Sequence, residues 1–172
     1  GLFNGDLVLW NIKDTKSVPK RIHTFQEQVN GVVFSPNGRY LLAGGMGQKF
    51  ILWDLSNLNV PVLQQQTPGS SVLSLGFSPD SERLIYANEN GEISILSILH
   101  PDEKPTTISY KGLLSGNIAI SPDGKKIAAC GQDMDIKIWQ IDFLDQPPMV
   151  LQGHSDMVRT ITFSPDGQYL LS

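Results

Sequence analysis

The chain has 172 residues, of which 40% are hydrophobic and 17% charged, and its formal net charge is −4. This composition is typical of a globular protein, and the acidic balance disfavours sequence-independent binding to nucleic acid or to an anionic membrane. No apolar run approaches the roughly 18 residues of a membrane-spanning helix, and a single cysteine, Cys130, excludes a disulfide within the chain. The sequence shows no secretory signal, so we expect a cytoplasmic protein.

The sequence repeats with a period of 43 residues. Four Ser-Pro pairs follow one another at this spacing, namely Ser35-Pro36, Ser78-Pro79, Ser121-Pro122 and Ser164-Pro165. A second column carries tryptophan in three repeats and leucine in the other: Trp10, Trp53, Leu96 and Trp139. Four periods of 43 residues account for the whole sequence without insertion or deletion. The repeat is therefore the unit from which the fold is predicted.

Each repeat is predicted to form four antiparallel strands, because its apolar residues recur at every second position in runs of about 5 to 7 residues. Ser-Pro-Asp-Gly marks a tight turn between the first and second strands, with glycine accepting a positive φ. Asn90-Gly91 favours a hairpin before a third strand. In the second complete repeat the expected strands are residues 72–77, 83–88, 92–98 and 106–110.

In chain order, the sequence predicts one half-blade (residues 1–28, third and fourth strands), three complete blades (29–71, 72–114 and 115–157) and a second half-blade (158–172, first and second strands). A single sheet with two apolar faces cannot bury both. We therefore expect an all-β fold in which these sheets stack as the blades of a β-propeller.

Two arrangements of the half-blades are open. Pairing of residues 168–171 with residues 6–12 would close a four-bladed ring, whereas unpaired half-blades would belong to an open arc of a larger ring, commonly of about seven blades. We predict the open arc, because a bulky column expected to face the central channel would crowd a four-bladed ring. That column consists of Val32, Leu75, Ile118 and Ile161.

These repeats resemble the WD-repeat family. Trp53-Asp54 matches the dipeptide that gives the family its name, and Trp10-Asn11 is a common variant of it. Gly153-His154 matches the Gly-His that opens a repeat, and Asp133, six residues before Trp139, matches the turn aspartate. In the family the His, a strand Ser, the Asp and the Trp form a buried hydrogen-bonded set, but no complete repeat here carries all four. The regular period and the Ser-Pro-Asp-Gly turns most resemble bacterial members.

The resemblance implies a non-catalytic scaffold or sensor module that binds other proteins or peptides. It also implies that the segment belongs to a larger multidomain protein and contacts the missing blades of the same parent chain. We expect neither nucleic acid nor a membrane as partner. An enzymatic propeller of the lactonase type, which also uses Ser-Pro-Asp-Gly turns, is the alternative, and a peptide-binding sheet edge is a third possibility.

No catalytic, metal or cofactor site is predicted. The three histidines, His23, His100 and His154, lie in different repeats, and no His/Cys cluster has the spacing of a zinc site. The tryptophan column and the lack of convergent acid and base residues favour a scaffold over an enzyme.

We expect partners to dock where the turn before each third strand and the segment leading into each first strand emerge on one face. The turn positions are Phe3, Met46, Glu89 and Gln132, and the segment positions include Gln28, Ser71, Leu114 and Met157. Four of these eight side chains are aromatic, methionine or leucine, with no packing role evident from the sequence, and exposed aromatics and methionines are typical of contact surfaces. The alternative is that missing blades or ordinary loop packing bury them.

Overall fold

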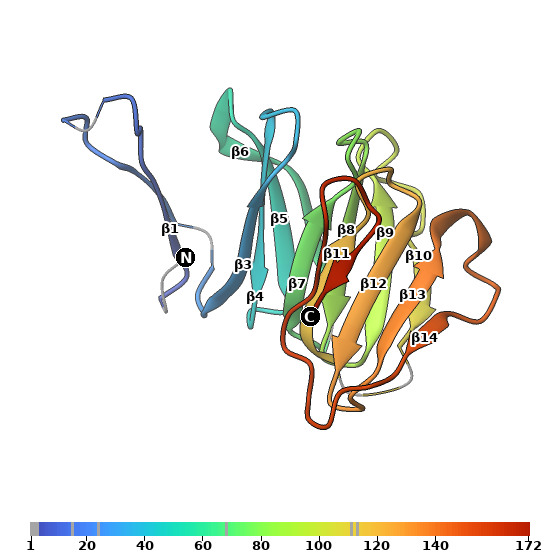
Figure 1. Ribbon diagram of the computed structural model, residues 1–172. Coiled ribbons are helices and arrows are strands. Elements are labelled where there is room, and N and C mark those ends of the chain that lie inside the picture. Colours follow the sequence, from blue (N-terminus) through green and yellow to red (C-terminus); the bar gives the residue numbers. More distant parts are fainter. Residues whose placement is uncertain (1–3, 15, 24, 68, 111, 113) are drawn as a thin grey trace.

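The computed structural model describes residues 4–14, 16–23, 25–67, 69–110, 112 and 114–172. Within them the secondary structure is almost entirely β (Figure 1). Three four-stranded antiparallel sheets follow one another along the chain, with a two-stranded sheet before them and another after them. This is the all-β architecture of stacked four-stranded blades that the 43-residue period predicts.

The strands run in chain order through the five sheets. The N-terminal half-blade contains β1 (Asp6–Leu9) and β2 (Lys20–His23). Blade 1 contains β3 (Val29–Phe34), β4 (Tyr40–Gly45), β5 (Lys49–Asp54) and β6 (Asn57–Gln66). Blade 2 contains β7 (Val72–Phe77), β8 (Arg83–Asn88), β9 (Glu92–Ser97) and β10 (Thr106–Ser109). Blade 3 contains β11 (Leu114–Ile120), β12 (Lys126–Gly131), β13 (Ile136–Gln140), a 3-10 helix (Ile141–Phe143) and β14 (Met149–Leu151). The C-terminal half-blade contains β15 (Thr162–Phe163) and β16 (Leu170–Leu171).

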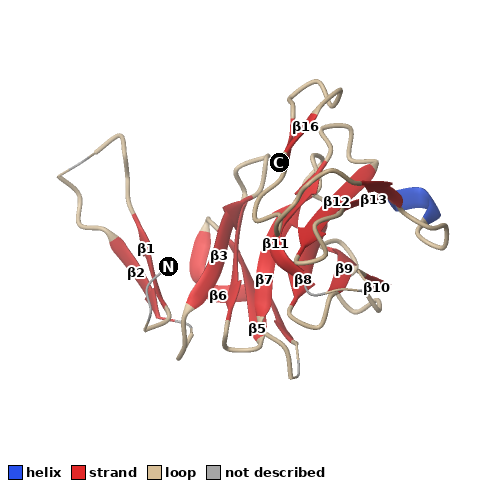
Figure 2. Ribbon diagram, turned by 60° about the horizontal axis from the view of Figure 1, so that its bottom comes forward, coloured by secondary structure: helices blue, strands red, loops and turns tan. Residues whose placement is uncertain are grey.

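Alternate side chains of each blade belong to two different hydrophobic cores. In blade 1, Leu41 and Trp53 are buried against the N-terminal half-blade, whereas Leu42 and Leu52 are buried against blade 2. Equivalent cores join blade 2 to blade 3 and blade 3 to the C-terminal half-blade. Figure 2 shows the sheets side by side. Because both faces of a blade are apolar, each blade needs a neighbour on either side.

The column of bulky residues on the first strands does not face a central channel, so that expectation was wrong. Ile118 is buried in the core between blades 2 and 3, and Ile161 is buried against blade 3. Leu75 packs against the core between blades 1 and 2. Val32 is 43% exposed, because the N-terminal half-blade beside it has no first or second strand. First-strand side chains in this column point at the neighbouring blade.

The two half-blades do not close a ring. β1 pairs only with β2 and β16 only with β15, and no ladder joins β1 to β16 in the described part of the chain. Figure 1 shows the β1–β2 hairpin standing at one end of the row of blades. The segment is therefore an open arc.

The Ser-Pro turns are held by one hydrogen-bonding pattern. In blade 3, Ser121 Oγ donates to Asp123 Oδ1 at 2.5 Å and accepts from the Lys126 N–H at 2.9 Å. The same contacts recur in the other turns with Asn37, Asp80 and Asp166 in place of Asp123. The residue after the carboxylate or amide has a positive φ in each turn: Gly38 (70°), Ser81 (64°), Gly124 (71°) and Gly167 (71°).

The surroundings of these turn glycines predict unequal effects of substitution. A Cβ at Gly38 would meet nothing within 4 Å, whereas a Cβ at Gly124 would lie 3.2 Å from Pro79 Cδ in the turn of the preceding blade. We expect Gly38→Ala to lower the free energy of unfolding by about 1 kcal/mol through backbone strain alone. Gly124→Ala should lower it further, because Pro79 must also shift. Urea unfolding midpoints measure both. Equal midpoints for the two variants would show that successive turns do not stack.

The turn carboxylates predict a loss of stability in acid. Hydrogen bonds from Ser78, Ser121 and Ser164 lower the pKa values of Asp80, Asp123 and Asp166 below the ordinary value of 3.8. A group whose pKa is lower in the folded state stabilises the fold above its unfolded pKa, and this contribution is lost as pH falls through the folded pKa.

We therefore expect the free energy of unfolding to fall below about pH 4. Asp123→Asn reproduces the neutral turn that Asn37 already forms in blade 1. In this variant the free energy of unfolding should therefore fall less steeply as the pH is lowered. Denaturant titrations at a series of pH values measure it. An identical acid dependence in the variant and the parent chain would contradict the assignment.

Candidate interaction face

The turn before each third strand is hydrogen-bonded to the segment that leads into the first strand of the same blade or the next. The Met46 N–H donates to the Gln28 carbonyl at 2.9 Å, and the Glu89 N–H donates to the Ser71 carbonyl at 3.1 Å. At the far side of blade 3, the Val158 N–H donates to the Gly131 carbonyl at 3.2 Å. These backbone bonds fix turns and segments at one end of the blades, which gives the face a rigid frame.

The predicted contact residues differ in how far they reach solvent. Met46 is 46% exposed and Met157 is 39% exposed. Glu89 and Gln132 are exposed, and Gln28 is half-buried. Phe3, which was also predicted for this face, lies outside the described residues. The side chains that a partner could touch therefore come from both the turns and the connecting segments.

Two residues predicted for the face are buried, and for them the prediction was wrong. Leu114 is 5% exposed, pairs with Gly131, and belongs to the core between blades 2 and 3. Ser71 is 8% exposed, directly before β7. Both lie where the chain enters a first strand, but Gln28 and Met157 at the equivalent positions are half-buried and 39% exposed, so this position in the repeat does not by itself decide burial.

Met134 was not predicted and adds an exposed methionine to the same turn as Gln132. It is 41% exposed and has a φ of 63°. The signal for this residue was its place in the β12–β13 hairpin turn, where a non-glycine residue with positive φ projects from the sheet. The described part of the face thus presents three methionines, Met46, Met134 and Met157.

A hydrogen-bonded network lies beneath the face and ties blade 2 to blade 3. The Tyr110 hydroxyl donates to Asp133 Oδ1 at 2.5 Å, and Lys137 Nζ donates to Asp133 Oδ2 at 2.5 Å and to the Tyr110 carbonyl at 3.1 Å. Lys137 Nζ also lies 4.0 Å from the centre of the Tyr110 ring. The Tyr110 and Trp139 ring centres are 6.3 Å apart. Asp133, the predicted turn aspartate, is thus bound by Tyr110 and Lys137.

The electrostatics of this network favour an ionised Asp133. Burial acts to raise the pKa of Asp133, but the hydrogen bonds from Lys137 and Tyr110 outweigh it, and the pKa lies below its ordinary value. Burial, followed by the hydrogen bond to Asp133, raises the pKa of Tyr110. Tyr110 therefore keeps its proton and acts as a donor, and its role here is structural.

The signature tryptophans occupy equivalent positions but different environments. Trp53 on β5 and Trp139 on β13 are 1% and 4% exposed, and they pair with Leu41 and Ile127 of the adjacent second strands. Trp10 lies one residue beyond the end of β1 and is 65% exposed. Trp53 and Trp139 are covered by the sheet that precedes their own blade, and among the described residues no sheet precedes the half-blade that carries Trp10.

The remaining signature residues have local partners. Asp54 accepts hydrogen bonds from the Ser56 hydroxyl and from Arg39 Nε at 2.8 Å, and these bonds lower its pKa to about 2. Gly153 has a φ of 148°. His154 is exposed, and its Nε2 lies 2.8 Å from Ser172 Oγ. In the described residues, the partner of the His154 side chain is thus Ser172, and not an aspartate or a tryptophan.

The described residues do not form the other kinds of site that the sequence was searched for: a metal site, a membrane-spanning helix or a reactive thiol. Within the described ranges, no three His, Cys, Asp or Glu side chains are placed to hold a metal ion. None of the helical segments in the described chain has the length and apolar character needed to cross a bilayer. Cys130 is buried, and burial raises the pKa of its thiol to about 11. That thiol therefore stays protonated at neutral pH, which makes it a poor nucleophile.

The family model described as "WD domain, G-beta repeat" matches residues 19–54, 114–140 and 145–172, together more than half of the chain. The chain is also similar to U3 small nucleolar RNA-associated protein 17 of Schizosaccharomyces pombe, with 33% identity over 53% of this chain and 11% of that protein. Ribosomal RNA-processing protein 9 of Saccharomyces cerevisiae is 30% identical over 48% of this chain and 16% of its own length.

Protein groucho of Drosophila melanogaster is 30% identical over 58% of this chain and 13% of its own length. The chain therefore spans no more than about a sixth of each of these three relatives.

Proposed function

Because the chain belongs to the WD-repeat family, we propose that it is a non-catalytic platform on which other proteins or peptides dock. The observation that carries this proposal is the face at which hairpin turns and connecting segments are locked together by backbone hydrogen bonds while methionine side chains project from it. A site that does no chemistry needs only such a shaped, rigid surface.

The composition of the face supports a protein partner. Methionine side chains are flexible and polarizable, so they adapt to apolar side chains of different shapes. Met46, Met134 and Met157 are each about two-fifths exposed or more, and the exposed Glu89 and Gln132 lie at equivalent turn positions between them in the sequence. A partner segment with apolar side chains and a neutral or basic margin fits this surface.

The relatives support the same class of partner. The names of two of them refer to ribosomal RNA processing and to association with a small nucleolar RNA, and these properties are those of the two relatives. For this chain we propose protein partners without nucleic acid contact, because the net charge of −4 supplies no basic footprint. We also propose that the segment works within a larger protein, since the matched relatives are far longer than the chain.

The proposal is tested by placing a charge on the face in the protein expressed in its own cells. We expect Met46→Asp and Met157→Asp each to reduce the recovery of specific partners by at least about tenfold, because a carboxylate in an apolar contact is desolvated without a partner. Quantitative affinity capture after nuclease treatment measures recovery. Val60→Asp, at a 62% exposed position on β6, is the matched control.

Retention of every captured protein by both face variants would show that the partners dock elsewhere. Loss of the captured proteins upon nuclease treatment of the unmodified protein would instead indicate that nucleic acid, not this face, holds them.

A further inference from the structure

Three non-glycine residues of the described chain have a backbone φ in the left-handed region: Gln48 (52°), Ser81 (64°) and Met134 (63°). A side chain at such a φ is strained, because its Cβ comes too close to the following carbonyl oxygen. At the place that Gln48 and Met134 hold in the 43-residue period, the other two turns have Gly5 and Gly91, with φ values of 84° and 77°. Met134 therefore occupies a place at which glycine forms the turn without strain.

Two of these three strained residues have a side-chain contact that stabilises the fold. Gln48 Oε1 accepts a hydrogen bond from the Gly69 N–H at 3.0 Å, and Ser81 Oγ accepts one from the Asn37 N–H in the turn of the preceding blade at 3.2 Å. In the described part of the chain, the Met134 side chain forms no hydrogen bond and belongs to none of the four hydrophobic cores. It is 41% exposed. No contact of this side chain within the described fold thus offsets the strain of its backbone.

The turn that carries Met134 is fixed from blade 2 by Tyr110. The Tyr110 hydroxyl lies 2.5 Å from Asp133 Oδ1 and 3.2 Å from the Asp135 carbonyl oxygen, so it contacts both the residue before and the residue after Met134. Lys137 Nζ binds the other oxygen of the Asp133 carboxylate. Strained residues persist where the surrounding structure over-determines their conformation, and they cluster where proteins hold ligands. The strained turn is therefore held rigidly, with the Met134 side chain projecting from it.

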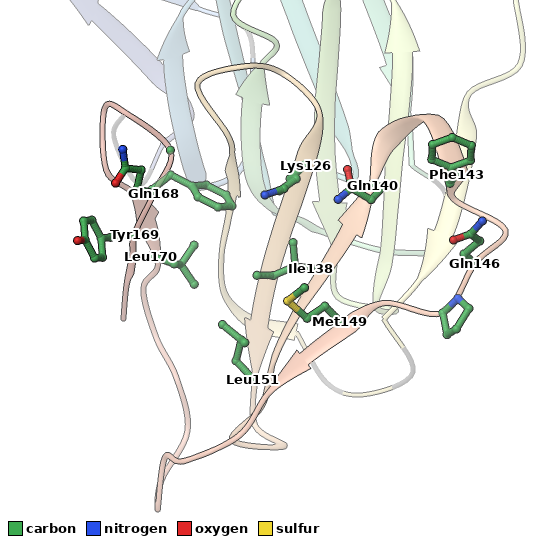
Figure 3. A pocket seen from close by; sticks show the side chains of 13 residues that line it. Lys126, Ile138, Gln140, Phe143, Gln146, Met149, Leu151, Gln168, Tyr169 and Leu170 are labelled. Carbon is green, nitrogen blue, oxygen red and sulfur yellow. The ribbon is translucent and has the colours of Figure 1, made fainter.

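Exposure alone does not distinguish Met134 from the other methionines. Met46 and Met157 are 46% and 39% exposed, and neither has a positive φ. Met149 is 62% exposed, but its backbone belongs to strand β14. Figure 3 shows the Met149 side chain in a groove beside blade 3, together with Ile138, Leu151 and Leu170. Among the methionines of the described chain, Met134 is thus the one whose exposure comes with a strained and firmly held backbone.

We propose that Met134 is the specificity-determining residue of the interaction face, and that it receives an apolar side chain of a peptide segment in which lysine or arginine flanks that side chain. The charge of the face supports basic flanks, because Glu27, Glu89 and Asp156 are exposed on its turns and connecting segments. In those described segments, Arg159 is the single exposed lysine or arginine. This inference rests on the proposed docking function and names the residue and the partner chemistry that carry it.

Substitutions at Met134 separate binding from folding. Met134→Gly should leave the thermal midpoint unchanged or raise it by up to about 4 °C, because glycine relieves the strain but makes the unfolded chain more flexible. Peptides selected on the full-length protein from a random library displayed on phage serve as the probe, and calorimetric titration measures their affinity. We expect Met134→Gly to weaken their binding by at least about tenfold. Met134→Asn, which tolerates positive φ without the flexibility of glycine, should weaken it equally, whereas Met134→Leu should bind as the parent does.

The matched control is Ser81→Gly, the same kind of substitution at a strained residue in a Ser-Pro turn, which should leave peptide affinity unchanged. Met46→Asp and Met157→Asp distinguish this inference from the docking proposal itself. If these two variants weaken the selected peptides but Met134→Gly and Met134→Asn do not, the face binds peptides and the role given to Met134 is wrong. If none of the four variants weakens them, both proposals fail. A midpoint lowered by Met134→Gly would show that the methionine stabilises the turn, and would also overturn the inference.

Discussion

Replacing Trp53 by alanine is expected to lower the free energy of unfolding by about 3–5 kcal/mol, the largest effect of any single substitution proposed here. Trp53 is 1% exposed and packs with Leu7, Leu41 and Leu58 in the core that joins the N-terminal half-blade to blade 1. Alanine would leave a cavity that the two sheets cannot fully close, because the other buried side chains of this core, among them Leu7 and Ile51, still keep the sheets apart. The thermal midpoint should fall by on the order of 10 °C.

The chain itself supplies the control for this substitution. Leu96 holds the tryptophan place in blade 2 and is 2% exposed, so Trp53→Leu should cost distinctly less than Trp53→Ala. Leu99→Ala, at a 62% exposed loop position, should change the free energy by less than about 0.5 kcal/mol. Urea unfolding of the three variants measures the differences. If Trp53→Ala lowered the free energy of unfolding no more than Leu99→Ala does, the packing of Trp53 between the two sheets would not stabilise the fold.

Removing the Asp133 carboxylate should lower the free energy of unfolding by about 2–3 kcal/mol. Asp133→Ala takes away the charged partner of Lys137, whose side chain is only 14% exposed, and an acceptor of the Tyr110 hydroxyl. Of the Lys137 contacts in the described residues, those to the Tyr110 carbonyl and ring then remain. Because the network joins blade 2 to blade 3, its loss should loosen the contact between blades instead of unravelling one strand.

A double-mutant cycle isolates this contribution. Tyr110→Phe alone should cost about 1 kcal/mol, and the double variant with Asp133→Ala should cost less than the sum of the two, since both changes break the same hydrogen bond. Asp102→Ala, in the exposed loop between β9 and β10, serves as the control. Strict additivity of Tyr110→Phe and Asp133→Ala would show that the two side chains do not interact in solution.

Local patterns were sufficient to predict most of the strands. The predicted strands 72–77 and 83–88 coincide with β7 and β8, and the predicted strands 92–98 and 106–110 each extend one residue beyond β9 and β10. Two-residue alternation, the Ser-Pro turn and Asn90-Gly91 are all properties of neighbouring residues. The 43-residue period then predicted the number of complete blades without any knowledge of contacts.

Features that depend on the neighbouring blade could not be predicted in this way. Alternation says that Ile118 and Leu114 lie on one side of a sheet or the other, but not what that side faces, and both are buried between blades 2 and 3. Leu114 is likewise buried in the core between blades 2 and 3, whereas Met46, in a hairpin turn, is 46% exposed.

The Tyr110–Asp133–Lys137 network was also beyond sequence reasoning. Tyr110 stands where the family pattern has the glycine of Gly-His. A comparison with the motif therefore shows that the glycine is missing, but does not indicate what the tyrosine does. The hydroxyl reaches Asp133 across 23 residues of sequence, and nothing local signals that approach. Asp133 lies in the turn before β13, but its partners come from a different blade and from β13 itself.

Amide hydrogen exchange along the whole chain tests most directly whether each 43-residue repeat folds as one blade stacked on the next. Buried ladders should exchange slowest, so maximal protection is expected at the paired central strands β4–β5, β8–β9 and β12–β13, recurring at the period of the sequence. The Ser-Pro turns between them should exchange fast at the same interval. Protection that follows no 43-residue period, or that is absent from one complete blade, would contradict the stacked-blade structure.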